Sequence, residues 1–223
     1  MRLLLTLLAL LSLGAGKPIE WTKSVSRTPA GSYVIGNPAA KVRLVEFMSY
    51  TCPHCGHFAA EGTPALMRDY VARGLVAFEI RNAVRDPLDL AAAIATRCGP
   101  AKSFPGNHEA VFAAQAGLFR KAADFNPTPT AKDPVAGMKA LSQTTGLTTL
   151  MARRGVAPAV LNACFASKAA QTPIIAMTND AWNTRKISGT PAFFINGNAI
   201  DANTWEGIEP RLRDALKLKP KGA

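Results

Sequence analysis

Short apolar runs rich in β-branched and aromatic residues stand near both ends of the chain, and helix-like patterns fill the middle. The strand-like runs cover residues 33–35, 42–47, 75–80, 191–195 and 199–200. The run at 42–47 is apolar almost throughout, which is typical of a strand buried on both faces of a sheet. The last two runs flank an Asn196-Gly197 turn, so they predict a hairpin.

Helical spacing dominates between these runs. The apolar residues Phe58, Leu66, Met67 and Tyr70 follow it, which predicts a helix that begins near Cys52. Further helical patterns lie at 86–98, at 109–119, from 133, from 158 and at 208–216, with a Pro-rich break at 126–129. A β-α-β unit at the front, a β-β-α unit at the back and a helical block between them predict an α/β domain with a helical insertion.

The N-terminal segment has the pattern of a secretory signal peptide. Arg2 precedes an apolar stretch at 3–13, and small residues follow at 14–16, so we expect a signal peptide at 1–16. The apolar stretch is too short to span a bilayer, and an uncleaved amphipathic anchor is the alternative. Export predicts an oxidising compartment, the periplasm. Residues 17–31 are expected to form a leader that joins the domain loosely.

Composition and charge narrow the possible classes of protein. The chain has 223 residues, of which 48% are hydrophobic and 18% charged, so it can bury a core and is not disordered. Lys and Arg outnumber Asp and Glu by 26 to 15, which gives a net charge of +11. The basic residues are scattered, are densest at 211–221, and accompany no zinc-finger, RNP or helix-turn-helix pattern. We therefore expect a solvated basic surface and no nucleic-acid partner.

The tetrapeptide Cys52-Pro53-His54-Cys55 follows the buried strand and opens the first predicted helix, where Pro53 suits the first turn. Thiol–disulfide chemistry needs a thiolate and a second thiol that resolves the mixed disulfide. The free N–H groups of a first helical turn point at the leading sulfur, so Cys52 is expected to be the exposed nucleophile. A helix terminus contributes up to about 2 kcal/mol, too little for a strongly lowered pKa, so His54 is expected to add a donor or a positive charge.

This tetrapeptide in its setting resembles the active site of thioredoxin-fold oxidoreductases, and the helical block and export signal narrow the resemblance to the DsbA-like periplasmic dithiol oxidases. The supporting motifs are Gly36-Asn37-Pro38, Glu46-Phe47 and the Gly-Thr-Pro-Ala-Phe-Phe-Ile-Asn-Gly sequence at 189–197. The resemblance extends over residues 33–218 and implies a thioredoxin-like fold with an inserted α-helical domain. The expected parts are a thioredoxin-like first part at 17–88, a helical insertion at 89–172 and a thioredoxin-like second part at 173–223.

The resemblance also implies roles for residues outside the tetrapeptide. Glu46 would be a buried acid beneath the active site that relays the proton of Cys55, and a carboxylate at the strand edge that points to water is the alternative. Thr190-Pro191 would form a cis-proline loop that faces the disulfide and offers its backbone to the substrate as an extra strand. A trans turn before the strand at 191–195 is the alternative.

The chain has four cysteines, and assigning Cys52 with Cys55 leaves Cys98 and Cys164. Both lie on apolar faces of predicted helices. In an oxidising compartment, a structural disulfide across their 66-residue separation would stabilise the fold by about 4 kcal/mol. Two buried free thiols are the alternative.

Other candidate residues carry weaker signals. A zinc site of Cys52, Cys55 and His57 lacks a fourth ligand, so we expect no metal and place His57 on the polar surface of a helix. His108 has no partner motif and is expected on a helix surface as well. An apolar collar around the active site, or alternatively ordinary core, is predicted from Met48, Tyr50 and Phe58.

Together these features predict a monomeric periplasmic dithiol oxidase. It would introduce disulfides into unfolded exported proteins through a mixed disulfide at Cys52, with the Cys52–Cys55 disulfide as its redox group and no bound cofactor. The resemblance implies reoxidation by a quinone-linked membrane partner of the DsbB type. A disulfide isomerase or reductase is the nearest alternative, and a redox-inactive peptide-binding chaperone or a metal carrier is further removed.

Overall fold

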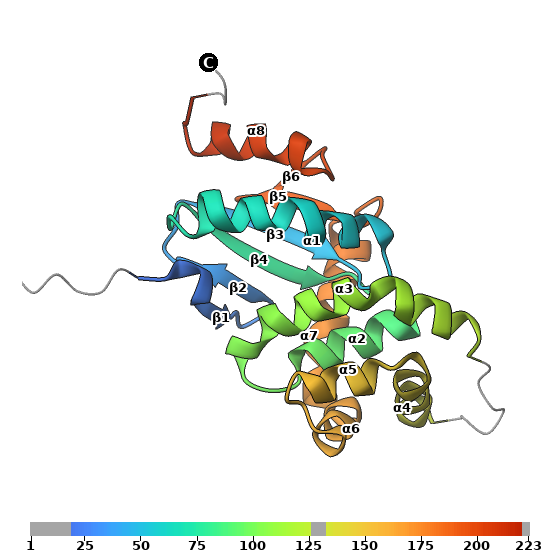
Figure 1. Cartoon of the computed structure of the whole chain (residues 1–223). Helices are drawn as coiled ribbons and strands as arrows, with labels where there is room; N and C mark the ends of the chain where they lie inside the picture. Colours follow the sequence, from blue (N-terminus) through green and yellow to red (C-terminus); the bar gives the residue numbers. More distant parts are fainter. Residues whose placement is uncertain (1–18, 126–132, 220–223) are drawn as a thin grey trace, which may run out of the picture.

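The structure, a computed structural model, describes residues 19–125 and 133–219 (Figure 1). The predicted signal peptide, the Pro-rich break at 126–129 and the last basic residue of the C-terminal cluster, Lys221, lie outside the described residues. Within the described ranges, no helix has the length and apolar character needed to cross a membrane.

A mixed sheet forms the centre of the fold. In the described part of the chain, six strands pair in the order β1-β2-β4-β3-β5-β6. Their bounds are Val25–Arg27 (β1), Tyr33–Gly36 (β2), Val42–Met48 (β3), Val76–Asn82 (β4), Ala192–Ile195 (β5) and Asn198–Ile200 (β6). The β3–β4 pair is parallel and the other neighbouring pairs are antiparallel. This topology agrees with the β-α-β and β-β-α units predicted from the hydrophobic pattern.

The helices cover the sheet and form the block between β4 and β5. Their bounds are Pro53–Leu66 (α1), Pro87–Arg97 (α2), Phe104–Ala123 (α3), Pro134–Thr145 (α4), Leu147–Arg153 (α5), Pro158–Ala166 (α6), Lys168–Asn179 (α7) and Trp205–Ala215 (α8). Short 3-10 turns lie at Trp21–Lys23 (η1) and Ala101–Ser103 (η3), and π-helical turns at Met67–Val71 (η2) and Asp180–Thr184 (η4). The fold is the predicted thioredoxin-like α/β arrangement with a helical insertion (Figure 1).

The alternation of side chains along β3 builds two apolar layers. Leu44 and Met48 belong to the large core cluster that also contains the buried residues of α1 and the apolar side chains Ile208 and Leu212 of α8. Val45 and Phe47 belong to a second cluster with Ala181 of η4 and Phe194 of β5. Because successive side chains of a strand point to opposite faces, Glu46 shares the α1 face with Leu44 and Met48.

The segment before β2 is tied to the domain more closely than the sequence indicated. Residues 25–27 form β1, which adds an antiparallel edge strand beside β2. The indole of Trp21 in η1 lies against Gly74, which has a φ of +69° and no space for a Cβ atom. The expectation of a loose leader is therefore wrong for the described part of residues 17–31.

The helical block is cross-linked. Cys98, at the C-terminal end of α2, forms a disulfide with Cys164 of α6, with 1.99 Å between the sulfur atoms and 6.0 Å between the Cα atoms. The structure thus has the bridge that the cysteine count favoured over two free thiols. Asp86 caps α2, within the predicted helical pattern at 86–98, by accepting from the Asp89 N–H, and Pro87 occupies the first turn.

Candidate active site

Cys52 occupies the N-cap position of α1, with extended backbone angles (φ −90°, ψ 118°), and Pro53 stands in the first turn. The carbonyl of Cys52 accepts the first helical hydrogen bond from the Gly56 N–H at 3.1 Å. An N-cap side chain lies where the free N–H groups of the first turn converge. The end of β3 therefore delivers one sulfur to the positive end of a helix, and the next turn places the other beside it.

The surroundings of Cys52 favour its thiolate. They lower the pKa of Cys52 from 9.0 to about 4, chiefly because the Cys55 thiol donates a hydrogen bond to its sulfur. Donation from Thr190 and from the backbone N–H groups of Cys55 and His54 adds to the effect, while burial opposes it. His54 thus contributes through its main chain, and its side chain is exposed. The predicted contribution of the imidazole stays a prediction.

The expectation that Cys52 is exposed is wrong for this state of the protein. Both Cys52 and Cys55 are free thiols, and Cys52 is only 3% exposed. The Cys52 S–H donates to the Thr190 carbonyl at 3.0 Å, so the loop before β5 covers the sulfur. Sequence spacing alone could not place this loop, because it lies far from Cys52 along the chain.

In contrast to those of Cys52, the surroundings of Cys55 favour its neutral thiol. Its sulfur is fully buried, and the Ser49 N–H, 3.5 Å away, points at it. Burial raises the pKa of Cys55, and its hydrogen bond to Cys52 and the nearby Glu46 carboxyl raise it further. Two neighbouring thiols with oppositely shifted acidities suit thiol–disulfide exchange, because one leaves readily as an anion and the other holds its proton.

Glu46 lies on the central strand β3, opposite Ile80 of β4 and Phe193 of β5. It is 2% exposed, so the alternative of a carboxylate at a wet strand edge is wrong. Burial raises the pKa of Glu46 to about 8, and the negative charge of Cys52 adds to this. Near neutral pH the group is therefore a buried carboxylic acid that can give up a proton close to the two sulfurs.

The loop before β5 faces the thiols, and its Thr190–Pro191 peptide bond is cis rather than trans. Besides its carbonyl contact with Cys52, Thr190 brings a buried side-chain hydroxyl to the site. This hydroxyl lowers the pKa of Cys52, so it stabilises the sulfur as an anion. The loop thus places both an acceptor for the thiol and a donor for the thiolate at one sulfur atom.

A pair of acidic residues holds the turn between β3 and α1. Asp89 is fully buried; its carboxylate accepts from the Tyr50 N–H at 2.8 Å and from the Arg85 N–H at 3.0 Å. Its neighbour Asp86 accepts from the Thr51 hydroxyl. Burial raises the pKa of Asp89 to about 7. The helical pattern at 86–98 does not reveal this role, because the contacts with Tyr50 and Thr51 are made across the fold.

Gln115 of α3 contacts the same turn from the helical insertion. Its side-chain amide donates to the Tyr50 carbonyl at 2.8 Å and to the Cys52 carbonyl at 2.9 Å. A Cβ atom at Gly56 would come within 2.5 Å of the Gln115 amide oxygen, so glycine leaves the space that Gln115 occupies. No sequence motif singled out Gln115.

The remaining candidate residues lie either on the surface of α1 or in the core. His57 is exposed, and its Nε2 atom lies 3.0 Å from Oε2 of Glu61 one turn further along α1. Within residues 19–125 and 133–219, no three His, Cys, Asp or Glu side chains gather as a metal-binding group. The three candidates for an apolar collar are core residues, each at most 3% exposed: Met48, Tyr50 and Phe58. The predicted surface position of His108 is wrong, because the residue is 6% exposed and bonded to Tyr50.

Comparisons with known proteins agree with this geometry. Residues 28–214 match the family described as thioredoxin. A crystal structure of a protein-disulfide isomerase from Novosphingobium aromaticivorans is 35% identical, with a TM-score of 0.75, over 83% of this chain and 97% of that one. Alpha-DsbA1 of Wolbachia pipientis has a TM-score of 0.63 at 20% identity, over 82% of this chain and 90% of that one. A Rickettsia felis protein named as a protein-disulfide oxidoreductase is 30% identical over 208 residues, 93% of this chain and 67% of the relative.

The family match, the relatives and the paired thiols identify a protein-disulfide oxidoreductase of the thioredoxin superfamily, and its fold is DsbA-like. The chain belongs to the thioredoxin family.

Proposed function

We propose that the protein is a dithiol oxidase that introduces disulfides into exported proteins in the periplasm. The opposed acidities of its two thiols carry this proposal: the pKa of Cys52 is lowered to about 4, and that of Cys55 is raised. At neutral pH the reduced site holds Cys52 as a thiolate and Cys55 as a thiol. Because this arrangement stabilises the reduced site, its disulfide form is a strong oxidant.

In the proposed reaction, a substrate thiolate attacks the Cys52 sulfur of the Cys52–Cys55 disulfide. The new bond joins the substrate to Cys52, and Cys55 leaves with the electron pair and takes a proton, which the buried acid Glu46 supplies. A second substrate thiolate then attacks the substrate sulfur of this mixed disulfide, and Cys52 leaves as a thiolate. Two substrate thiols become a disulfide, and the enzyme disulfide becomes a thiolate at Cys52 and a thiol at Cys55. Of the two protons that the substrate thiols lose, one restores the Glu46 carboxyl group and the other passes to solvent.

Three observations support the setting of this reaction. The pattern of residues 1–16 and the Cys98–Cys164 disulfide both favour an oxidising compartment outside the cytoplasm. The cis Thr190–Pro191 loop faces the sulfurs and suits the backbone of an extended, unfolded substrate, which would add as a strand. A monomer that is reoxidised by a quinone-linked membrane protein of the DsbB type completes the proposed cycle.

Equilibration with mixtures of reduced and oxidised glutathione tests the direction of electron flow. We expect a reduction potential far above the roughly −300 mV of structural disulfides. A potential near that of a structural disulfide would contradict the oxidase proposal. Cys52→Ala should lose all oxidase activity, whereas full activity of this variant toward unfolded proteins would indicate a redox-inactive chaperone.

Disulfide isomerisation is the second candidate, because the 35% identical Novosphingobium aromaticivorans protein is called an isomerase. The two functions differ in their substrates. An oxidase reaches full rate with a reduced, unfolded protein, and an isomerase restores activity to a protein with scrambled disulfides. We expect the rate of oxidation of the reduced protein to exceed the rate of reactivation of the scrambled protein by a large factor. The reverse order would favour the isomerase.

A further inference from the structure

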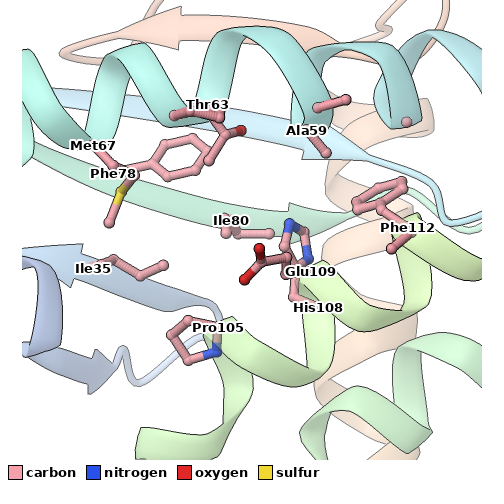
Figure 2. Close-up of a pocket in the computed structure, with 14 residues that line it drawn as sticks. Ile35, Ala59, Thr63, Met67, Phe78, Ile80, Pro105, His108, Glu109 and Phe112 are labelled. Atoms are coloured by element: carbon pink, nitrogen blue, oxygen red, sulfur yellow. The ribbon is translucent and has the colours of Figure 1, made fainter. Parts of the chain in front are cut away.

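An apolar cavity of about 450 Å³ lies between α1 and α3, over the β2 and β4 strands (Figure 2). Its volume lies within the range of pockets that hold small organic ligands. Phe78 and Phe112 provide aromatic lining, and Met67 adds a thioether to it. Such a lining favours a flat aromatic ring, because ring–ring and sulfur–ring contacts add to the burial of apolar surface.

His108, which is buried and lines the cavity, has an imidazole ring whose tautomer is set by its hydrogen bond to Tyr50. The Tyr50 hydroxyl donates its hydrogen to Thr96 Oγ1 at 3.1 Å, and the Tyr50 oxygen lies 2.9 Å from His108 Nδ1. Because the hydroxyl has a single hydrogen, His108 Nδ1 is the donor in the second bond. A neutral imidazole that donates from Nδ1 carries a lone pair on Nε2.

The lone pair on His108 Nε2 is available to a ligand. Burial, with the charge of Arg97, lowers the pKa of His108 to about 3, so the ring stays neutral. Nε2 has no hydrogen-bond partner within the described ranges, and the ring lines the cavity. Figure 2 shows the ring rising from α3 toward Ile80, and the Glu109 side chain also lines the cavity. The cavity thus offers one neutral acceptor and a negative charge, so it selects a ligand with a donor and disfavours an anion.

We propose that this cavity binds an aromatic group with one hydrogen-bond donor, a phenol or an indole, whose donor bonds to His108 Nε2. Such a group occurs in free small molecules and in the tyrosine and tryptophan side chains of polypeptides. The polypeptide source rests on the proposed function, because the substrate would then be held while its thiol reacts at Cys52. Gly56 lines the cavity and lies one helical turn beyond Cys52, so an extended substrate could reach both.

Binding of p-cresol, measured by isothermal calorimetry, tests the requirement for a donor. 4-Methylanisole has the same ring and no donor, and it would leave Nε2 buried without a partner. We expect p-cresol to bind at least about tenfold more tightly. Tyramine should likewise bind more tightly than 4-hydroxyphenylacetate, because the latter brings a negative charge close to Glu109. Equal affinities for p-cresol and 4-methylanisole, or no binding of p-cresol up to its solubility limit, would overturn the proposal.

Two substitutions locate the binding in this cavity. Thr63→Trp fills the space from α1 and should abolish p-cresol binding. Glu61→Trp places the same side chain at an exposed position of α1 outside the cavity and should leave binding unchanged. If thermal unfolding shows that Thr63→Trp does not fold, the smaller change Ala59→Leu narrows the same cavity. Binding that survives in a folded filled variant would refute the site.

Dithiol peptides that differ only in tyrosine or O-methyltyrosine distinguish the two sources of the ligand. A lower KM for the tyrosine peptide, lost in Thr63→Trp, would show that the cavity holds a substrate side chain. Equal KM values together with p-cresol binding would show a free small molecule as the ligand. If neither peptide is oxidised, the proposed function is wrong. The p-cresol measurement then still tests whether the cavity binds a phenol.

Discussion

The Cys52 sulfur lies 3.0 Å from the backbone carbonyl oxygen of Thr190, although 138 residues separate the two along the chain. The same residue brings a buried hydroxyl that lowers the pKa of Cys52. One residue of the cis-proline loop therefore contacts the sulfur in its protonated form and stabilises it in its charged form.

Thr190→Val should raise the pKa of Cys52 above about 4. The substitution removes a donor to an anion and keeps the shape of the side chain, so we expect a rise of about one to two units. Thiolate absorbance in the ultraviolet, followed against pH, measures it. Thr184→Val, at an exposed position, is the matched control. An unchanged titration in Thr190→Val would show that the hydroxyl does not stabilise the thiolate.

Glu46→Gln should make the reduced protein more stable at alkaline pH and leave its stability near pH 4 unchanged. The pKa of Glu46 is about 8 in the folded protein and 4.5 ordinarily, so the folded state binds more protons between these values. Its stability therefore falls as pH rises from about 4.5 to 8, and glutamine removes this loss. The free energy of unfolding in urea, measured at several pH values, tests this prediction, and the exposed substitution Glu61→Gln is the control. Parallel pH profiles of native and Glu46→Gln protein would contradict the raised pKa.

Glu46→Gln should also slow turnover without unfolding the protein, because glutamine cannot give a proton to the Cys55 sulfur. Stopped-flow measurement of mixed-disulfide formation, the step in which Cys55 leaves the Cys52–Cys55 disulfide, reports this proton transfer. The proposed proton transfer is wrong if the rate equals that of the native protein.

Asp89→Ala should lower the free energy of unfolding by about 2–5 kcal/mol, because it leaves the buried N–H group of Tyr50 and the partly buried N–H group of Arg85 without acceptors. Asp89→Asn keeps one acceptor oxygen and should recover part of the loss. Denaturant titration measures both variants, and exposed Asp201→Ala serves as the control. An Asp89→Ala protein as stable as the native one would show that these bonds contribute little.

Replacement of Cys98 and Cys164 together by alanine should lower the free energy of unfolding by about 4 kcal/mol, the value expected for a bridge across 66 residues. The bridge lies in the helical block, away from Cys52, so the rate of oxidation of a small dithiol should stay the same. Unfolding in urea and a dithiol assay on the same sample separate the two effects. A large loss of oxidation rate in a folded variant would place the bridge in the redox chemistry.

The sequence predicted those features that depend on neighbouring residues. The apolar run before Cys52, the Pro53 turn and the spacing to Cys55 fix the strand, the helix start and the paired thiols. Glu46 was detectable as well, because a carboxyl group in the middle of a buried strand is costly unless the fold uses it. Local physical chemistry was sufficient for this part of the site.

Contacts between distant segments account for the rest. His108 was misplaced because its partner, Tyr50, lies 58 residues earlier, and a single sequence does not show which face of α3 is covered. The burial of Cys52 depends on the Thr190 loop, which joins the site only when β5 pairs with β3. Gln115 acts on backbone carbonyls, and such contacts leave no pattern of side-chain types in the sequence.

Gln115 has a consequence for attempts to engineer the protein. A single amide from the helical insertion supports two carbonyls of the turn that presents Cys52. A shortened variant that lacks the helical insertion would keep the tetrapeptide but lose these two hydrogen bonds. The tetrapeptide alone is therefore not sufficient to transfer the redox centre to another protein. Grafting it onto a smaller scaffold also requires a substitute for the amide of Gln115.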